Sequence, residues 1–297
     1  MQQANRLAHR HRITKLKVVP YVFIAPAVLY FIILTIIPAI MAFPISLSDW
    51  SALTPNRNYV GFSNYQKLLT DSNFWKSCLV MAQFFLYVPL VMLLGLGAAL
   101  LLNNSVKGIR IFRVIFYAPV ITSIVAASIL FEWFYQPSFG LFNYLLEFFH
   151  LPTLGWVEDP NTAVLSVMIF KLWRGFGGSM LIYLAGLQGI DGEIREASAI
   201  DGAGAFKKFR YITFPLLKPA HTYLLITNFI GVFMIFQETY MLKGRLNSTR
   251  TVVNYIFEKA FSSYRMGYAS AMSFVLFVII LSVTILQYRG MKLNKEL

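Results

Sequence analysis

The chain of 297 residues is 57% hydrophobic and 16% aromatic, and only 13% of its residues are charged. So few charges cannot cover the surface of a soluble protein, which excludes that class and indicates an integral membrane protein. The formal net charge of +13 does not indicate nucleic-acid binding. The basic residues are spread among short loops and are not interleaved with aromatic residues on one face.

Six apolar stretches are long enough to cross a membrane. A transmembrane helix needs about 20 mostly apolar residues to span about 30 Å of hydrocarbon. The stretches are rich in Leu, Ile, Val, Phe and Ala, which favours helices over the short alternating strands of a β-barrel. We therefore predict an all-α integral membrane protein with six transmembrane helices, at 19–43, 78–102, 111–135, 162–187, 216–241 and 267–288.

Residues 1–18 form a basic polar tail, followed by one membrane domain over 19–297. We expect the tail to lie against anionic lipid headgroups, with docking to a partner protein as the alternative. Lys and Arg are denser in the tail and in alternate loops than in the loops between them. The positive-inside rule then predicts that both termini are cytosolic.

The outer loops and the span prolines give local expectations. We expect loop 44–77 to lie on the membrane surface, and loop 136–161 to hold a short apolar helix that forms a compact lid. Prolines remove a helix hydrogen bond, and neighbouring helices in a membrane tolerate them. Kinks are therefore expected at the prolines within the spans, at Pro26, Pro38, Pro89 and Pro119.

The polar segment 188–215 separates the fourth and fifth apolar stretches. Asp191 is placed to cap a short helix that has acidic residues in its first turn. Gly202 allows a left-handed turn into a second short helix that ends before Pro215. This pattern predicts a helix–turn–helix elbow at the membrane face, and spacing alone fits a solvated connector equally well.

The run EASAIDGAGAFKKFRYITFPLLKP, from Glu196 to Pro219, resembles the cytoplasmic EAA loop of permease subunits in binding-protein-dependent ABC importers. The resemblance extends over most of the chain, including VGFSNY, LWRGFG, AGLQGI and GYASAMSFVLF, and points to the carbohydrate class and the larger permease subunit of maltose-type transporters. It implies a type I ABC importer permease fold with the EAA loop at 189–219. Two departures are Ser198 in place of the usual second alanine and Asp191 where proline is frequent.

In that family the EAA helix fits a groove in a separate ATPase subunit. The resemblance therefore implies an ATPase-coupling role for Glu196, Ala197, Ser198, Asp201, Gly202, Ala203, Phe209 and Pro215. The loop MLKGRLNSTR lacks the family's usual glycine-rich run, which leaves its contacts with an external binding protein open.

Two cations lie within the fourth apolar stretch. Lys171 and Arg174 are three residues apart and share one helix face, which Gly175 and Gly178 continue. An uncompensated cation at mid-membrane costs about 3 kcal/mol on insertion scales, so both must face protein or water. One reading is that they pair with Glu132 or Glu238 between helices, or that Arg174 reaches the interface.

The other, compatible reading is a substrate pathway. By resemblance to maltose-type permeases, the positions lining the sugar site are Val120, Ile124, Lys171, Arg174, Gly175, Gly178, Gly231, Val232 and Ile235. Ammonium and guanidinium groups bind carboxylates and hydroxyls. We therefore expect a mono- or oligosaccharide, either acidic or simply polyhydroxylated.

The chain has no phosphate-binding G-x-x-x-x-G-K-[ST] motif and no histidine pair with metal-ligand spacing. We expect no enzyme activity, no metal site and no cofactor in this chain, with ATP and Mg bound by the partner ATPase. The resemblance implies a heterodimer with a second permease, an ATPase dimer, an extracytoplasmic binding protein and a place in the bacterial cytoplasmic membrane. The alternatives are a secondary transporter or channel without ATP coupling, and a membrane-embedded enzyme.

Overall fold

The computed structural model describes residues 19–54, 57–103 and 108–293. The predicted basic tail, 1–18, lies outside the described residues. Over these ranges the chain is helical, and its one β-bridge joins Ser48 to Tyr59. The predicted all-α class is confirmed.

The chain divides into two compact units. The first holds the described residues up to Leu69 together with Lys259–Phe274, and the second holds Thr70–Glu258 and the described residues from Val275 onward. The first unit contains a long apolar helix over Val19–Ser46, whose last part is α2 (Ile37–Ser46). Buried Asn64 at the start of α3 (Ser63–Thr70) fixes the end of this helix by donating to the Ser46 and Ser48 carbonyls at 2.8 and 2.9 Å.

Five described helical segments are long and apolar enough to cross a membrane, in agreement with five of the predicted spans. They are Val19–Ser46, Ser72–Leu102, Ala163–Gln188, Lys218–Met241 and Met266–Gly290. The second comprises α4 (Ser72–Gln83) and α5 (Tyr87–Leu102), the third is α9 (Ala163–Gln188), the fourth comprises α13 (Lys218–Phe233) and α14 (Gln237–Met241), and the last belongs to α16 (Met266–Leu293).

The remaining predicted span, 111–135, is broken into two helices. α6 (Ile109–Ile121) and α7 (Ile124–Phe134) meet at 97°. The expected kink at Pro119 is wrong, because Pro119 lies buried inside α6 and the chain becomes extended at Thr122 and Ser123. The Thr122 hydroxyl donates to the Ala118 carbonyl at 2.8 Å. Such local side-chain bonds compete with helix continuation.

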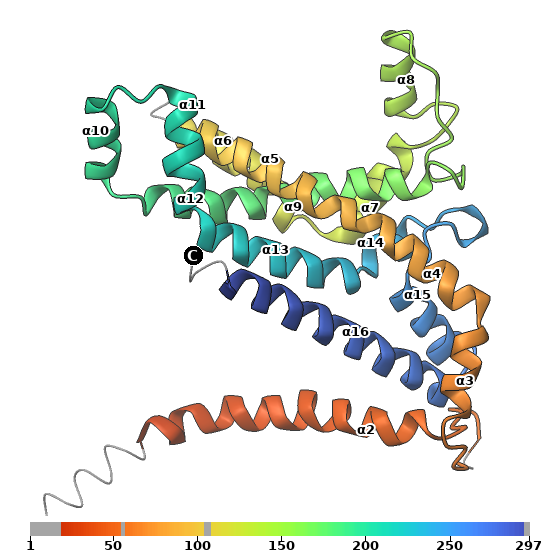
Figure 1. The fold of residues 1–297 in the computed structure, drawn as a ribbon. Coiled ribbons are helices and arrows are strands. Elements are labelled where there is room, and N and C mark those ends of the chain that lie inside the picture. The colour runs from red at the N-terminus through yellow and green to blue at the C-terminus, as the bar shows by residue number, and fades with distance from the viewer. Residues whose placement is uncertain (1–18, 55–56, 104–107, 294–297) are drawn as a thin grey trace, which may run out of the picture. The chain divides into compact units, whose positions relative to one another are not determined.

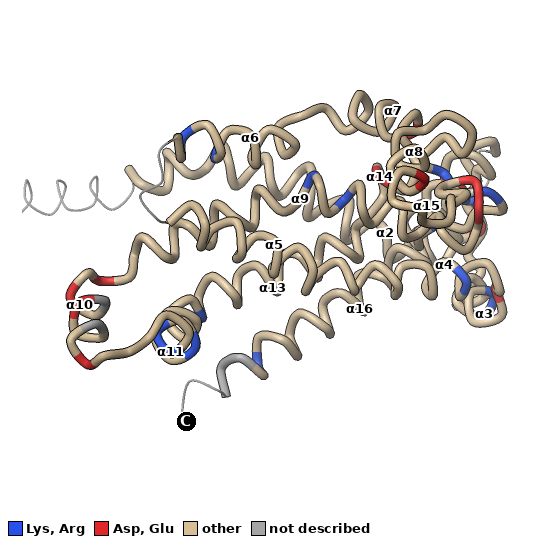
Figure 2. Tube along the Cα trace, turned by 90° about the horizontal axis from the view of Figure 1, so that it is seen from above, with Lys and Arg blue, Asp and Glu red and all other residues tan. Residues whose placement is uncertain are grey.

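The bent pair nevertheless leads from one end of the second unit to the other. Figures 1 and 2 show α6 starting at the end of the unit that carries α10 and α11, and α7 finishing near α8 at the other end. The pair therefore counts as one crossing. With the other five segments it completes the predicted six transmembrane helices.

Close packing of α5 on α9 forms the centre of the second unit. A Cβ placed on Gly95 of α5 would lie 2.6 Å from the Ser179 Cβ and 2.9 Å from the Met180 backbone nitrogen. Small residues let membrane helices approach in this way. On α9 itself, a Cβ placed on Gly177 would lie even closer to the backbone of α6, at the Phe116 carbonyl oxygen.

A polar contact joins the start of the second span to a helix outside the spans. Asp71 caps α4 and accepts a 2.7 Å hydrogen bond from the Tyr255 hydroxyl of α15 (Val252–Phe257). The short apolar helix expected in loop 136–161 is confirmed as α8 (Leu141–Phe148). Figure 1 shows it projecting away from α9 at the end opposite α10, and its role as a lid stays a prediction.

Candidate functional site

The predicted elbow follows directly from the end of α9. It consists of α10 (Gly192–Ile200), α11 (Ala205–Lys208), a π-helical turn η3 (Phe209–Thr213) and α12 (Phe214–Leu216). The Asp191 carboxylate accepts from the Glu193 backbone N–H at 3.3 Å, which confirms the predicted cap. Gly202 has a φ of 70°, which confirms the predicted left-handed turn.

The second helical segment of the elbow is longer than predicted. It was expected to end before Pro215, but it continues through η3 and α12 and breaks at Leu217, after which α13 begins. Pro215 lies in the first turn of α12. Proline has no backbone N–H to donate to the preceding turn, and the π-helical turn η3 comes directly before α12.

The expected coupling residues lie along the elbow with different exposures. Glu196 and Ala197 are exposed on α10, whereas Ser198 is buried. The turn is closed by a 3.1 Å hydrogen bond from the Ala203 N–H to the Ser198 carbonyl, with Asp201 and Gly202 exposed between them. Further along, Phe209 is half-buried against Phe214, and Pro215 is exposed.

The elbow carries opposite charges on its two arms and exposed apolar side chains between them. Figure 2 shows acidic residues on α10 and basic residues on α11. Ile200, Phe206 and Tyr211 are 86%, 77% and 72% exposed. Sequence reasoning missed these three, although large apolar residues in a polar loop are a usable signal of a protein-binding surface.

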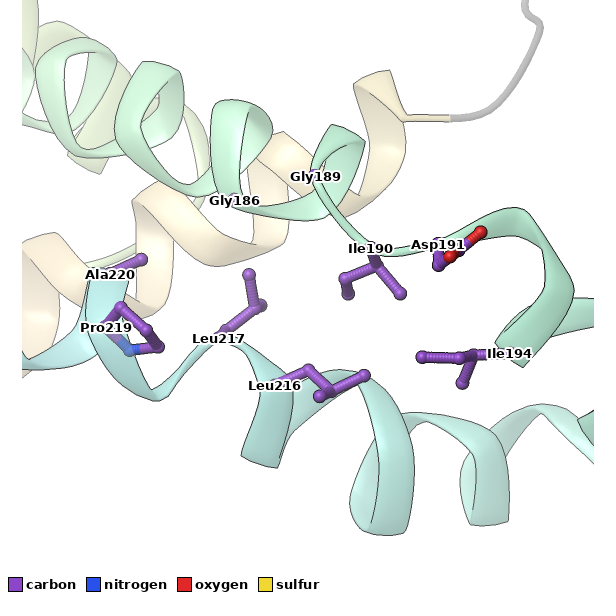
Figure 3. A pocket seen from close by; sticks show the side chains of 9 residues that line it. All are labelled: Gly186, Gly189, Ile190, Asp191, Ile194, Leu216, Leu217, Pro219 and Ala220. Carbon is purple, nitrogen blue, oxygen red and sulfur yellow. The ribbon is translucent and has the colours of Figure 1, made fainter. Parts of the chain in front are cut away.

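A pocket of about 310 Å³ lies where the elbow joins the spans. In Figure 3, Ile190 and Ile194 face Leu216 and Leu217 across it, and Asp191 lies at its edge. The apolar lining therefore comes from both the entry to the elbow and its exit. The remaining lining residues are Gly186, Gly189, Pro219 and Ala220.

A second group of polar residues lies within the spans. The Lys171 ammonium is 3.1 Å from the Glu238 carboxylate, and their side chains are only 13% and 15% exposed. The same ammonium lies 5.0 Å from the centre of the Tyr87 ring. Of the two carboxylates considered from the sequence, Glu238 is the partner. The pair compensates a cation that would otherwise be costly at this depth.

Arg174 makes a different contact, at the break between α6 and α7. Its guanidinium donates to the Thr122 carbonyl at 3.3 Å. Thr122 terminates α6, so the cation lies at the negative end of that helix. A backbone carbonyl freed within a membrane needs a partner. Arg174 therefore stabilises the broken span in this conformation.

The other expected pathway positions are divided between open and buried surroundings. Gly175 packs against the Tyr87 hydroxyl, whereas a Cβ at Gly178 or Gly231 would meet no atom within 4 Å. Val120 and Ile124 are half-buried on either side of the break. Val232 and Ile235 are at most 2% exposed and belong to the hydrophobic core, so they pack against protein in this conformation.

Sequence reasoning also missed Tyr87 and Thr122 as members of this group. An aromatic residue and a threonine in apolar spans carry no pattern that distinguishes them from neighbours.

Comparison with known proteins agrees with this architecture. The family described as binding-protein-dependent transport system inner membrane component matches residues 79–289. The chain belongs to this family. It is an ABC transporter permease of the kind that the EAA resemblance implied.

Two relatives and one solved structure cover nearly the whole permease. The chain is 34% identical to the trehalose/maltose transport system permease protein MalF of Thermococcus litoralis, over 93% of this chain and 94% of that protein. It is 32% identical to the arabinooligosaccharides transport system permease protein AraP of Bacillus subtilis, over 92% and 88%. A crystal structure of a bacterial alginate ABC transporter contains a chain with the same fold, at a TM-score of 0.82, 20% identity and coverage of 93% and 94%.

Proposed function

We propose that this permease is one half of an ATP-driven saccharide importer of the bacterial cytoplasmic membrane. The other parts are a second related permease, an ATPase dimer that binds ATP and Mg, and an extracytoplasmic binding protein. The observation that carries the proposal is the elbow between α9 and α13, in a chain whose family is that of binding-protein-dependent transport components.

The surface of the elbow supports ATPase coupling. Its exposed apolar side chains at Ile200 and Phe206 give a partner protein area to bury. The acidic α10 and basic α11 add charges that fix the orientation of that partner (Figure 2). Because α10 follows α9 and α12 precedes α13, movement of a bound ATPase reaches two spans directly.

A saccharide is the cargo class that the relatives support, since MalF and AraP are named for trehalose/maltose and arabinooligosaccharides. The Lys171–Glu238 pair refines this choice. Its ammonium is already compensated by a carboxylate, so it offers both donors and acceptors to hydroxyl groups without a net charge. A neutral polyhydroxylated sugar therefore suits the pair better than an acidic one.

Crosslinking tests the coupling. Ala203→Cys, in a Cys78→Ala background that removes the chain's one native cysteine, is expected to crosslink to the ATPase in membranes. Glu158→Cys, in the loop beyond α8, is the matched control and should not react with it. Failure of Ala203→Cys to capture the ATPase, or sugar uptake that persists without the ATPase, would favour a carrier or channel instead.

Stimulated ATPase activity tests the cargo. The reconstituted complex is measured with neutral and acidic oligosaccharides, each presented with its cognate binding protein. Neutral sugars are expected to stimulate hydrolysis more strongly than acidic ones. Stimulation by acidic sugars alone would contradict the inference that the Lys171–Glu238 pair favours a neutral sugar. It would leave the proposed ATPase coupling intact.

A further inference from the structure

α8 presents an apolar face that no described part of its own unit covers. Leu141, Tyr144 and Phe148 of α8 are 43%, 66% and 68% exposed, and Phe149 just beyond it is 65% exposed. An exposed cluster of large apolar residues usually marks a contact with another molecule or a membrane. We name these four residues the α8 face.

The α8 face is held rigidly from behind. The buried Asn143 side chain donates to the Pro137 and Leu154 carbonyls, both at 3.0 Å, and accepts from the Trp156 indole at 2.7 Å. The Phe142 ring packs against Tyr135 and Trp156 at centroid distances of 5.2 and 5.5 Å. The orientation of the α8 face is therefore fixed by the fold.

This apolar surface continues from a membrane-spanning element. Ile129 and Trp133 on α7 are 47% and 65% exposed, and Phe139 in the connection to α8 is 74% exposed. No charged residue lies between Glu132 and Glu147. The connection from Trp133 to Tyr144 therefore carries no charged side chain, and exposed Glu132 and Glu147 flank it.

The direction and composition of α8 match a membrane interface. Figure 1 shows α8 lying across the direction of α9, at the end where the spans finish. Tyr and Trp concentrate at the two membrane interfaces, and helices with a large apolar face lie there in the plane of the bilayer. The segment 136–161 contains no Lys or Arg, so apolar burial rather than attraction to anionic headgroups would hold it.

We propose that the α8 face contacts lipid and anchors the 136–161 loop in the outer interface of the membrane. The orientation of α8 relative to α9 and its continuity with α7 carry this choice. A docking face for the external binding protein or for the second permease is the competing outcome of the test.

Spin-label accessibility decides between these outcomes. Phe148→Cys is labelled in the Cys78→Ala background, with the full chain reconstituted in phosphatidylcholine vesicles. Its accessibility to oxygen, which partitions into lipid, is compared with that to a water-soluble nickel chelate. Trp133→Cys on α7 is the lipid-facing control, and exposed Glu158→Cys in the same loop is the water-facing control.

The expected oxygen-to-nickel ratio at position 148 is several-fold above that at 158 and close to that at 133. A ratio like that at 158 overturns the proposal, and shielding from nickel only after binding protein is added assigns the face to that protein. Shielding from both probes in the assembled complex assigns it to a protein partner. Tyr144→Cys repeats the measurement should Phe148→Cys fail to fold. None of these outcomes depends on the cargo or on ATPase coupling.

Discussion

Removing Glu238 from the buried ion pair should cost more stability than removing Lys171, because it leaves a cation without its partner within a span. Glu238→Gln should destabilise the permease by up to about 3 kcal/mol, since the Lys171 side chain would lose its carboxylate partner. The double variant Lys171→Met/Glu238→Gln should recover most of that loss. Thermal unfolding of the purified permease in detergent measures both.

The Arg250–Glu258 pair provides a control for this prediction. Its atoms are 3.2 Å apart, but the Glu258 side chain is 42% exposed. Glu258→Gln should therefore cost less than about 1 kcal/mol. Equal losses for Glu238→Gln and Glu258→Gln would show that burial of the Lys171 pair has no special energetic role.

Gly202 provides a second residue-scale prediction, because its φ of 70° is unfavourable for a residue with a side chain. Gly202→Ala should destabilise the observed conformation of the elbow by about 1 kcal/mol. The population of that conformation would fall roughly fivefold. Sugar-stimulated ATPase activity should fall by a similar factor. Gly204→Ala is the control, since Gly204 has extended backbone and its Cβ would meet nothing within 4 Å. A similar loss in both variants would count against a conformational role for Gly202.

At the scale of the element, the contact of α5 with α9 depends on the missing side chain of Gly95. Gly95→Ala would push a methyl group into the backbone at Met180, which cannot move aside as a side chain can. Overpacking of this kind costs about 1–3 kcal/mol. Gly97→Ala, on the same helix but facing open space, should leave unfolding unchanged. A melting temperature that falls in both variants, or in neither, would contradict the packing argument.

The helices were largely predictable, and their breaks were not. Spans could be found from length and apolar composition alone, because lipid demands both. The break at Thr122 and Ser123 could not, since Pro119 is the stronger local signal and the stabilising contact comes from Arg174 on another helix. The Asp191 cap and the Gly202 turn were predictable because each depends on neighbouring backbone only.

The polar group in the spans was predictable only in part. Lys171 and Arg174 stand out as cations in an apolar stretch, and Glu238 was one of two possible partners. Choosing between Glu132 and Glu238 requires knowing how α9 packs against α14, which is long-range information. The same applies to Val232 and Ile235, whose burial depends on the rotation of α13 and the break after it.

At the scale of the whole molecule, α9 lies between the loop beyond α8 and the elbow, so a crossing by α9 puts these two segments on opposite sides of the membrane. In intact cells, a membrane-impermeant maleimide should label Glu158→Cys but should reach Ala203→Cys only after permeabilisation. Both variants carry Cys78→Ala. Labelling of both positions from the same side would contradict the crossing by α9. The reverse pattern, in which Ala203→Cys reacts in intact cells and Glu158→Cys only after permeabilisation, would mean that α6 and α7 form a re-entrant loop.

The 26 residues of α9 run without a break from Ala163 to Gln188, a length of about 39 Å. An unbroken helix has no hinge at which a displacement of one end could be absorbed. Whatever tilts the elbow must also swing the Lys171 ammonium and the Arg174 guanidinium relative to Glu238 and Thr122. In the proposed importer, each ATP-driven movement of the elbow would thus displace two polar contacts within the membrane, far from any nucleotide.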